Sequence, residues 1–173
     1  MKIRRIFIVS TLIITLFSLY LYIGGWPIVL NNNKTQMLKF SNFNNLMFNP
    51  LNNIDFSSGE NKVFLVFSLD DINELPGKII KRKVLVCSDN EVLKLLKNNF
   101  TFKISGGDMA TVNSEIIVFS NNELVLKTNI FIDKNLIGIQ DKKTGWAKAM
   151  NTKELYDIFS QFKPYRKVFL SLK

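Results

Sequence analysis

The run Ile6–Ile23 constrains this chain most, because its 18 residues include no charged residue and no proline. As a helix rising ~1.5 Å per residue, and with Gly24–Trp26 added, it reaches ~30 Å, the thickness of a bilayer's hydrocarbon core. A secretory signal usually has a shorter apolar region and small residues at its cleavage site, and no A-x-A pattern follows here. Tyr20 and Tyr22 are amphipathic rings placed where such a helix would leave the bilayer. We therefore expect a membrane anchor from Ile6 to Ile23, with a cleaved signal as the alternative.

The charges around this run predict its orientation. Lys2, Arg4 and Arg5 precede it, whereas only Lys34 and Lys39 follow it before the first acidic residue. The more basic end of a span stays in the cytoplasm. We expect a single-pass protein of the cell inner membrane, with its N-terminus in the cytoplasm and its C-terminal domain in the periplasm.

Composition divides the chain into three segments. We expect a cytoplasmic head and anchor at 1–27, a polar tether at 28–60 that includes a possible short amphipathic helix around 35–48, and an extracytoplasmic domain at 61–173. The net charge is +9 and the sequence pI is about 9.7. Outside the membrane nucleic acid is not an available partner, so anionic lipid headgroups or an acidic protein fit this charge better. A codon bias toward Lys and Asn is the simpler explanation of this charge.

The periodicity of 61–173 predicts an α+β domain. Apolar runs and alternation indicate strands, and spacings of three and four between apolar residues indicate helices. The expected strands are 63–69, 79–87, 100–104, 112–120, 123–132, 136–140 and 167–172, and the expected helices are 88–99 and 151–162. Short turns between consecutive strands imply antiparallel pairing. The predicted fold is an N-terminal transmembrane helix followed by an antiparallel sheet, strongly curved or a partial barrel, that carries two helices.

The absence of histidine limits the chemistry of this chain more than any other feature of its composition. It excludes Ser-His-Asp and Cys-His catalysis and imidazole zinc sites. The one cysteine, Cys87, forms neither an internal disulfide nor a redox pair, although a bridge to another molecule stays open. We expect no catalytic residue, no cofactor and no metal site. A carboxylate hydrolase built on Asp70, Asp71 and Glu74 is the alternative, and a solvated connection is the simpler interpretation of that segment.

Aromatic residues are the best candidates for an interface. The chain contains 15 phenylalanines, more than a modest core needs, so some could line an apolar cavity or a contact surface. Phe40 and Phe43 lie in the possible tether helix, and Trp146 follows a turn glycine. We take these three as interface candidates, while a plug of the domain core is the default role for Trp146.

The short "KIRR" head, the single apolar run and the strand-rich remainder resemble one family in their order and size. These are the small bitopic accessory proteins of ToxR-like membrane-bound transcription activators, of the ToxS, VtrC, PsaF and FidL type. The resemblance implies a protein that is not an enzyme. It would bind and stabilise the periplasmic domain of a membrane-bound regulator protein, and could share with it an apolar pocket for a small molecule such as a bile acid. The alternative is a structural component of an envelope secretion, pilus or conjugation apparatus.

Overall fold

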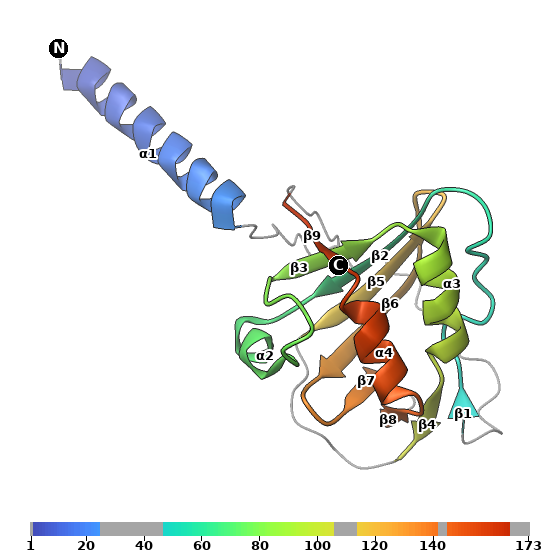
Figure 1. Cartoon of the computed structure of the whole chain (residues 1–173). Helices are drawn as coiled ribbons and strands as arrows, with labels where there is room; N and C mark the ends of the chain where they lie inside the picture. Colours follow the sequence, from blue (N-terminus) through green and yellow to red (C-terminus); the bar gives the residue numbers. More distant parts are fainter. Residues whose placement is uncertain (1, 25–46, 106–113, 142–144, 167–173) are drawn as a thin grey trace.

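The computed structural model describes residues 2–24, 47–105, 114–141 and 145–166 (Figure 1). Its helices are α1 (Lys2–Gly24), α2 (Leu69–Glu74), α3 (Asn90–Asn99) and α4 (Thr152–Phe159). Its strands are β1 (Met47–Phe48), β2 (Asn61–Val66), β3 (Val84–Cys87), β4 (Phe102–Ile104), β5 (Glu115–Ser120), β6 (Glu123–Ile132), β7 (Ile137–Asp141), β8 (Gly145–Ala149) and β9 (Lys163–Pro164).

All nine strands belong to one antiparallel sheet in the order β1-β4-β8-β7-β6-β5-β2-β3-β9. The terminal strands β1 and β9 do not pair with each other, so the sheet is open. The predicted curved or partial-barrel sheet with two helices is therefore wrong, since the described residues form an open α+β sheet with four helices. Barrel closure depends on which strands meet at the two ends, and alternation along a strand does not encode that.

Asn121 and Asn122 form the tight turn between β5 and β6. Their φ angles are 52° and 64°, the left-handed values that asparagine tolerates and that a two-residue hairpin requires. The turn lies between the expected strands 112–120 and 123–132, where the sequence predicted a short connection. It places the two longest central strands side by side, with Glu115 opposite Asn129 at their far ends.

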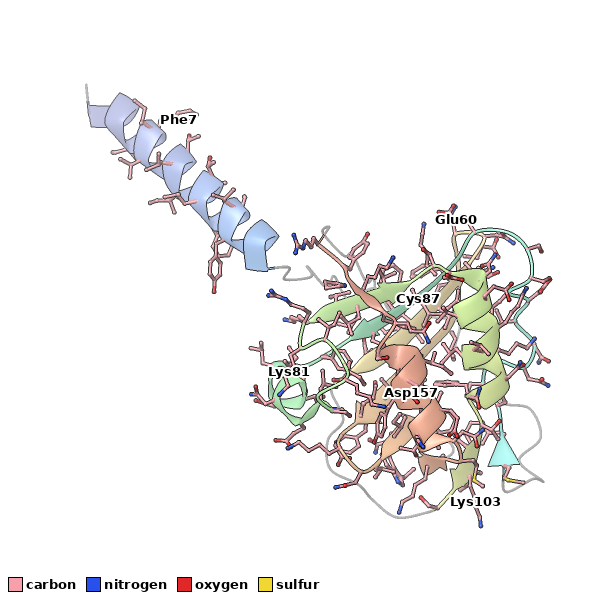
Figure 2. The ribbon with its side chains drawn as sticks, in the orientation of Figure 1. Phe7, Glu60, Lys81, Cys87, Lys103 and Asp157 are labelled. Carbon is pink, nitrogen blue, oxygen red and sulfur yellow. The ribbon has the colours of Figure 1, made fainter. Side chains whose placement is uncertain are left out.

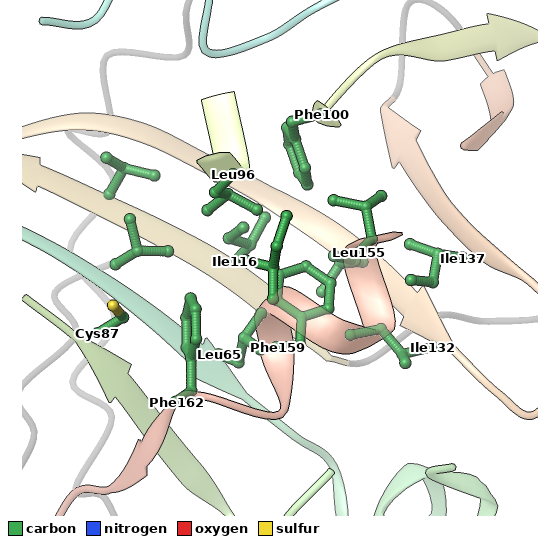
Figure 3. Close-up of a cluster of buried hydrophobic side chains, with 14 of the residues drawn as sticks. Leu65, Cys87, Leu96, Phe100, Ile116, Ile132, Ile137, Leu155, Phe159 and Phe162 are labelled. Atoms are coloured by element: carbon green, nitrogen blue, oxygen red, sulfur yellow. The ribbon is translucent and has the colours of Figure 1, made fainter. Parts of the chain in front are cut away.

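Helices α3 and α4 cover one face of the sheet and enclose the main core (Figures 1 and 3). Both helices are amphipathic, and their buried side chains are Leu93, Leu96, Leu155, Ile158 and Phe159. They pack on strand residues such as Leu65, Ile116 and Ile137. Burying one side chain of this size contributes about 1.5–3 kcal/mol, so the cluster stabilises this face.

Local polar groups determine where the helices begin. The predicted helix 88–99 begins at Asn90 as α3, and Asp89 caps it, because the Asp89 carboxylate accepts hydrogen bonds from the N–H groups of Glu91 and Val92. Ser68 caps α2 by accepting from the Asp71 N–H. The sequence interpretation treated this segment as a connection, since its six residues are too few to show a helical period.

The predicted strand 79–87 is shorter in the structure than expected. Only Val84–Cys87 pair as β3, because Ile79 turns into the core and its N–H bonds to the Pro76 carbonyl. β3 lies between β2 and β9, so β9 forms the edge. Pro164 in β9 has no N–H to offer a further strand, a feature that protects edges from aggregation.

No helix in the described part of the chain has both the length and the apolarity that a membrane crossing requires. The predicted membrane span Ile6–Ile23 is therefore wrong. The predictions that depend on it, a signal anchor and a single-pass inner-membrane protein with a periplasmic domain, are wrong with it.

Residues before β2 also contribute to the core. Leu51, Ile54 and Phe56 are buried within the main cluster. The earlier part of the possible tether helix, up to residue 46, lies outside the described residues, and its last two positions form β1. The predicted strand 167–172 also lies outside them.

Candidate functional site

α1 carries most of the exposed large apolar side chains in the described part of the chain. From Ile6 to Tyr20, its large hydrophobic residues are between 52% and 73% exposed. Figure 1 shows the helix extending away from the sheet, and Figure 2 shows side chains such as Phe7 projecting from it on several sides. Monomeric soluble proteins rarely leave a continuous apolar surface of this kind uncovered, so α1 is a candidate binding element.

The hydroxyl groups of α1 are satisfied within the helix. Ser10 Oγ and Thr11 Oγ1 each donate to the Phe7 carbonyl at 2.9 Å, and Thr15 Oγ1 donates to the Thr11 carbonyl at 2.9 Å. A hydroxyl that bonds back to the preceding turn no longer needs a donor contact with a partner. A partner that covers these three positions therefore does not need to accept a hydrogen bond from their hydroxyl groups.

Isolated helices of this kind are only marginally stable in water. Their stability in proteins comes mainly from packing one face against other elements. α1 is also rich in β-branched isoleucine and threonine, which lose side-chain freedom in a helix. A helix that is apolar on most sides is normally buried. α1 has the surface of an element that another macromolecule covers.

Trp146, one of the three predicted interface candidates, is buried in β8 with 1% of its surface exposed. Its ring lies on the side of the sheet opposite α3 and α4, against Gly138 of β7, and makes an edge contact with Phe131 of β6 at 6.0 Å. The indole N–H has no hydrogen-bond partner among the residues that the structure describes. Phe40 and Phe43 lie outside the described residues, so the structure does not bring the three candidates together.

A buried ion pair between β5 and β6 was not found from the sequence. Lys127 Nζ of β6 lies 3.1 Å from Glu115 Oε2 of β5, and the two side chains are 9% and 8% exposed. The available signal was alternation in 123–132, which puts Lys127 on the same face as Phe131, away from the main core. Charged groups this buried are stable only as a pair, so the contact fixes the register of two central strands.

Within the acidic cluster considered for a hydrolase, Asp71 makes a hydrogen bond that joins two elements of the fold. Asp71 Oδ2 accepts a hydrogen bond from Ser114 Oγ, and Ser114 Oγ accepts from the Ser68 N–H. Ser114 is buried, so its hydroxyl joins the start of α2 to β5. Asp70 and Glu74 are exposed on α2. Within the described residues no group of three His, Cys, Asp or Glu side chains could hold a metal ion.

Cys87 ends β3 and faces the main core (Figure 3). Burial raises the pKa of its thiol above the ordinary value of 9.0. The sulfur lies 3.9 Å from the Asp89 carbonyl oxygen, a distance that allows a weak S–H hydrogen bond. Because the thiolate is the reactive form, this cysteine behaves as a small core residue.

The basic segment before β3 makes contacts to the body of the protein. Lys78 Nζ lies 2.7 Å from Asp157 on α4, and this hydrogen bond lowers the pKa of the Asp157 carboxyl. Lys81 Nζ donates to the Asn73 carbonyl at 3.2 Å. Both lysines are exposed, so the contacts position the segment and add little stability.

No family model, no curated protein and no solved structure matches this chain. The resemblance to accessory proteins of ToxR-like regulators therefore stays a prediction. Among the elements in the described residues, α1 exposes the largest number of large apolar side chains.

Proposed function

We propose that this chain is a binding protein that acts without catalysis and that α1 is its recognition helix. The α+β body presents the helix, and the apolar side chains of α1 enter a groove on a partner protein. Helix-in-groove recognition places apolar side chains of a helix in a hydrophobic groove of the partner, and α1 carries exposed apolar side chains along its described length.

One observation carries this proposal: the large apolar side chains from Ile6 to Tyr20 are all exposed, while those of α3 and α4 pack on the sheet. The body of this chain buries its apolar side chains in a core, whereas α1 leaves its apolar side chains exposed. Covering them with an apolar surface of a partner would therefore lower the free energy. A regulator protein, the partner that the family resemblance implies, is the first candidate to test.

Site-specific photo-crosslinking in the source cell tests the proposal. A photoreactive amino acid replaces Leu12 or Phe17 on α1, and Lys103 or Lys153 on the body serves as a matched exposed control. We expect protein adducts from both α1 positions and few from either control. Absence of protein adducts from both α1 positions would show that no protein binds the helix.

A further inference from the structure

We infer that Lys103 and Lys148 form a binding site for a phosphate group on the face of the sheet opposite α3 and α4. The inference does not depend on the proposed role of α1 and concerns a different part of the molecule. It starts from the register of two strands, in which Lys103 of β4 lies directly opposite Lys148 of β8. The Cα atoms of such an antiparallel pair are about 4.5–5.5 Å apart, so both side chains can reach one ligand above the sheet.

Both lysines point away from the main core. Phe102 precedes Lys103 and is buried in that core, and Ala147 precedes Lys148 and is buried there too. Because successive side chains of a strand alternate between the two faces of a sheet, the lysines share the opposite face. Both are exposed, and Figure 2 shows Lys103 at the margin of the body beside β1. A ligand in solution can therefore reach them.

Two lysines in this arrangement repel each other. Like charges directly opposite on neighbouring strands destabilise a sheet. No described residue forms an ion pair with either lysine, and Glu115, an acidic side chain on the same face, is paired with Lys127. Its strand β5 lies three strands from β8, which is ~14 Å at ~4.8 Å per strand. An anion bound between the two ammonium groups would remove the repulsion.

Protection of the sheet edge does not account for this pair. Lysine on an edge strand opposes edge-to-edge aggregation. β8 is an inner strand between β4 and β7, and β1 lies beyond β4. Places where a sequence breaks a local rule of sheet pairing are expected at functional sites. The pair therefore indicates a ligand and not an edge.

Trp146 adds a hydrogen-bond donor on the same face, two positions before Lys148. Its indole Nε1 is buried and has no hydrogen-bond partner among the described residues. A Cβ built on Gly138 would meet Trp146 Cζ2, the ring atom on the Nε1 side of the indole, and Gly138 is the β7 residue opposite Lys148. A buried donor without an acceptor costs stability, so this end of the ring favours a ligand that carries oxygen acceptors.

These donors favour phosphate over a carboxylate. Two ammonium groups match a doubly charged anion, and lysine binds phosphate as a point charge. A phosphate group also has enough oxygen atoms to accept from two ammonium groups and an indole, whereas a carboxylate has a single charge and two oxygens. The net charge of +9 attracts anions to the molecule from a distance. The group belongs to a small soluble molecule or to a lipid headgroup, two sources with the same chemistry.

Equilibrium dialysis of the full chain against radiolabelled pyrophosphate, at constant ionic strength, tests the site. We expect saturable binding by the wild type and about tenfold or more weaker binding by Lys148→Gln, because the variant loses a hydrogen bond to a charged group. The matched control Lys153→Gln removes one exposed lysine from α4 and leaves the same net charge. It should change the affinity less than about twofold, and Lys148→Arg, which keeps the charge, should retain binding.

Thermal unfolding provides a second readout with the opposite sign. Removal of one member of a repelling pair should raise the Tm of the free chain in Lys148→Gln by about 1–3 °C. Pyrophosphate should raise the Tm of the wild type more than that of this variant, since a ligand stabilises the state that binds it. A gain of stability in Lys148→Gln together with a loss of binding separates a ligand site from a merely structural role.

Competition distinguishes the two sources of the phosphate group. Vesicles that contain phosphatidic acid and displace pyrophosphate, when pure phosphatidylcholine vesicles do not, would assign the site to a lipid headgroup. Failure of both to displace it would assign the site to a small soluble molecule. Equal binding of pyrophosphate by the wild type, Lys148→Gln and Lys153→Gln would overturn the inference, because net charge and not the pair would then attract the anion. Absence of saturable binding by the wild type would overturn it as well, and neither result bears on α1.

Discussion

Replacement of Gly138 by alanine is the most direct test of the packing around Trp146. A Cβ built at Gly138 would lie within 3.0 Å of Trp146 Cη2 and Cζ2, closer than real Cβ contacts, and 3.0 Å from the Ala147 carbonyl oxygen. The ring has little room to move away, since it is buried and packs against Phe131. Gly138→Ala therefore forces this buried ring or two strands to shift.

The expected magnitude follows from two opposing effects. Overpacking of a well-filled site destabilises by about 1–3 kcal/mol. Alanine also restricts the unfolded chain more than glycine does, which stabilises by about 0.4–1 kcal/mol. We expect a net loss of about 1–2 kcal/mol, equivalent to a Tm about 2–8 °C lower for a chain of this size.

Urea unfolding of Gly138→Ala measures this loss, and Gly77→Ala is the matched control. A Cβ at Gly77 meets nothing within 4 Å, so the same substitution there should be neutral or stabilise by up to ~1 kcal/mol. A double-mutant cycle with Trp146→Phe tests the mechanism, because the smaller ring removes the contact. The double variant should be more stable than the sum of the single effects predicts, by about 1 kcal/mol. Full additivity, or a neutral Gly138→Ala, would refute the reasoning.

Three further substitutions test contacts that stabilise the body. Glu115→Gln leaves the Lys127 ammonium buried without its carboxylate, so urea unfolding should report a loss of about 3–5 kcal/mol, and a loss below ~1 would contradict a desolvated pair. Asp89→Ala should destabilise by about 1 kcal/mol in the same assay while Ser88→Ala changes stability by less than ~0.5, and equal effects would disprove the assigned cap. Tyr156→Phe removes the 2.7 Å hydrogen bond from the phenol to the Asp133 carbonyl; burial raises the pKa of this phenol to about 12. Thermal unfolding should show a loss of stability of about 0.5–1.5 kcal/mol. An unchanged Tm would show that the hydrogen bond adds no stability.

Local patterns predicted the elements whose own residues determine their structure. The asparagine pair at 121–122 marked its hairpin because few other residues tolerate the required φ. Alternation marked β6, whose core-facing and outward residues exchange regularly along ten positions. In contrast, β8 was missed, because glycine, two alanines and a lysine around Trp146 give no β-branched signal.

The arrangement of the strands could not be obtained from such patterns. β2 lies between β5 and β3, and β4 lies between β1 and β8, pairings that join residues far apart in the sequence. The burial of the ion pair between Glu115 and Lys127 could not be predicted either, because it also depends on how the strands are arranged. Neither residue has a local sequence feature that distinguishes it from an exposed charge. Segment 79–83 was predicted as part of a strand because Ile79 and Ile80 are consecutive apolar residues. In the structure the Ile79 N–H donates to the Pro76 carbonyl in a turn.

The apolar character of α1 was evident from the sequence, but what covers it was not. Length and hydropathy predicted a bilayer, and no helix in the described residues satisfies that requirement. Composition describes how much apolar surface a helix has, whereas the partner is determined by the pattern on each face.

Hydrogen–deuterium exchange of α1 measures most directly whether another protein covers this helix. The complex is isolated from source cells through a tag at the C-terminus of the full chain, and the amides of residues 6–20 are followed in it and in Ile13→Asp. We predict slow exchange of these amides in the wild type, as for the core strands, and fast exchange in the variant with the body unchanged. Equally fast exchange of α1 in both proteins would contradict the account, because it would show the helix uncovered while the rest of the molecule is folded.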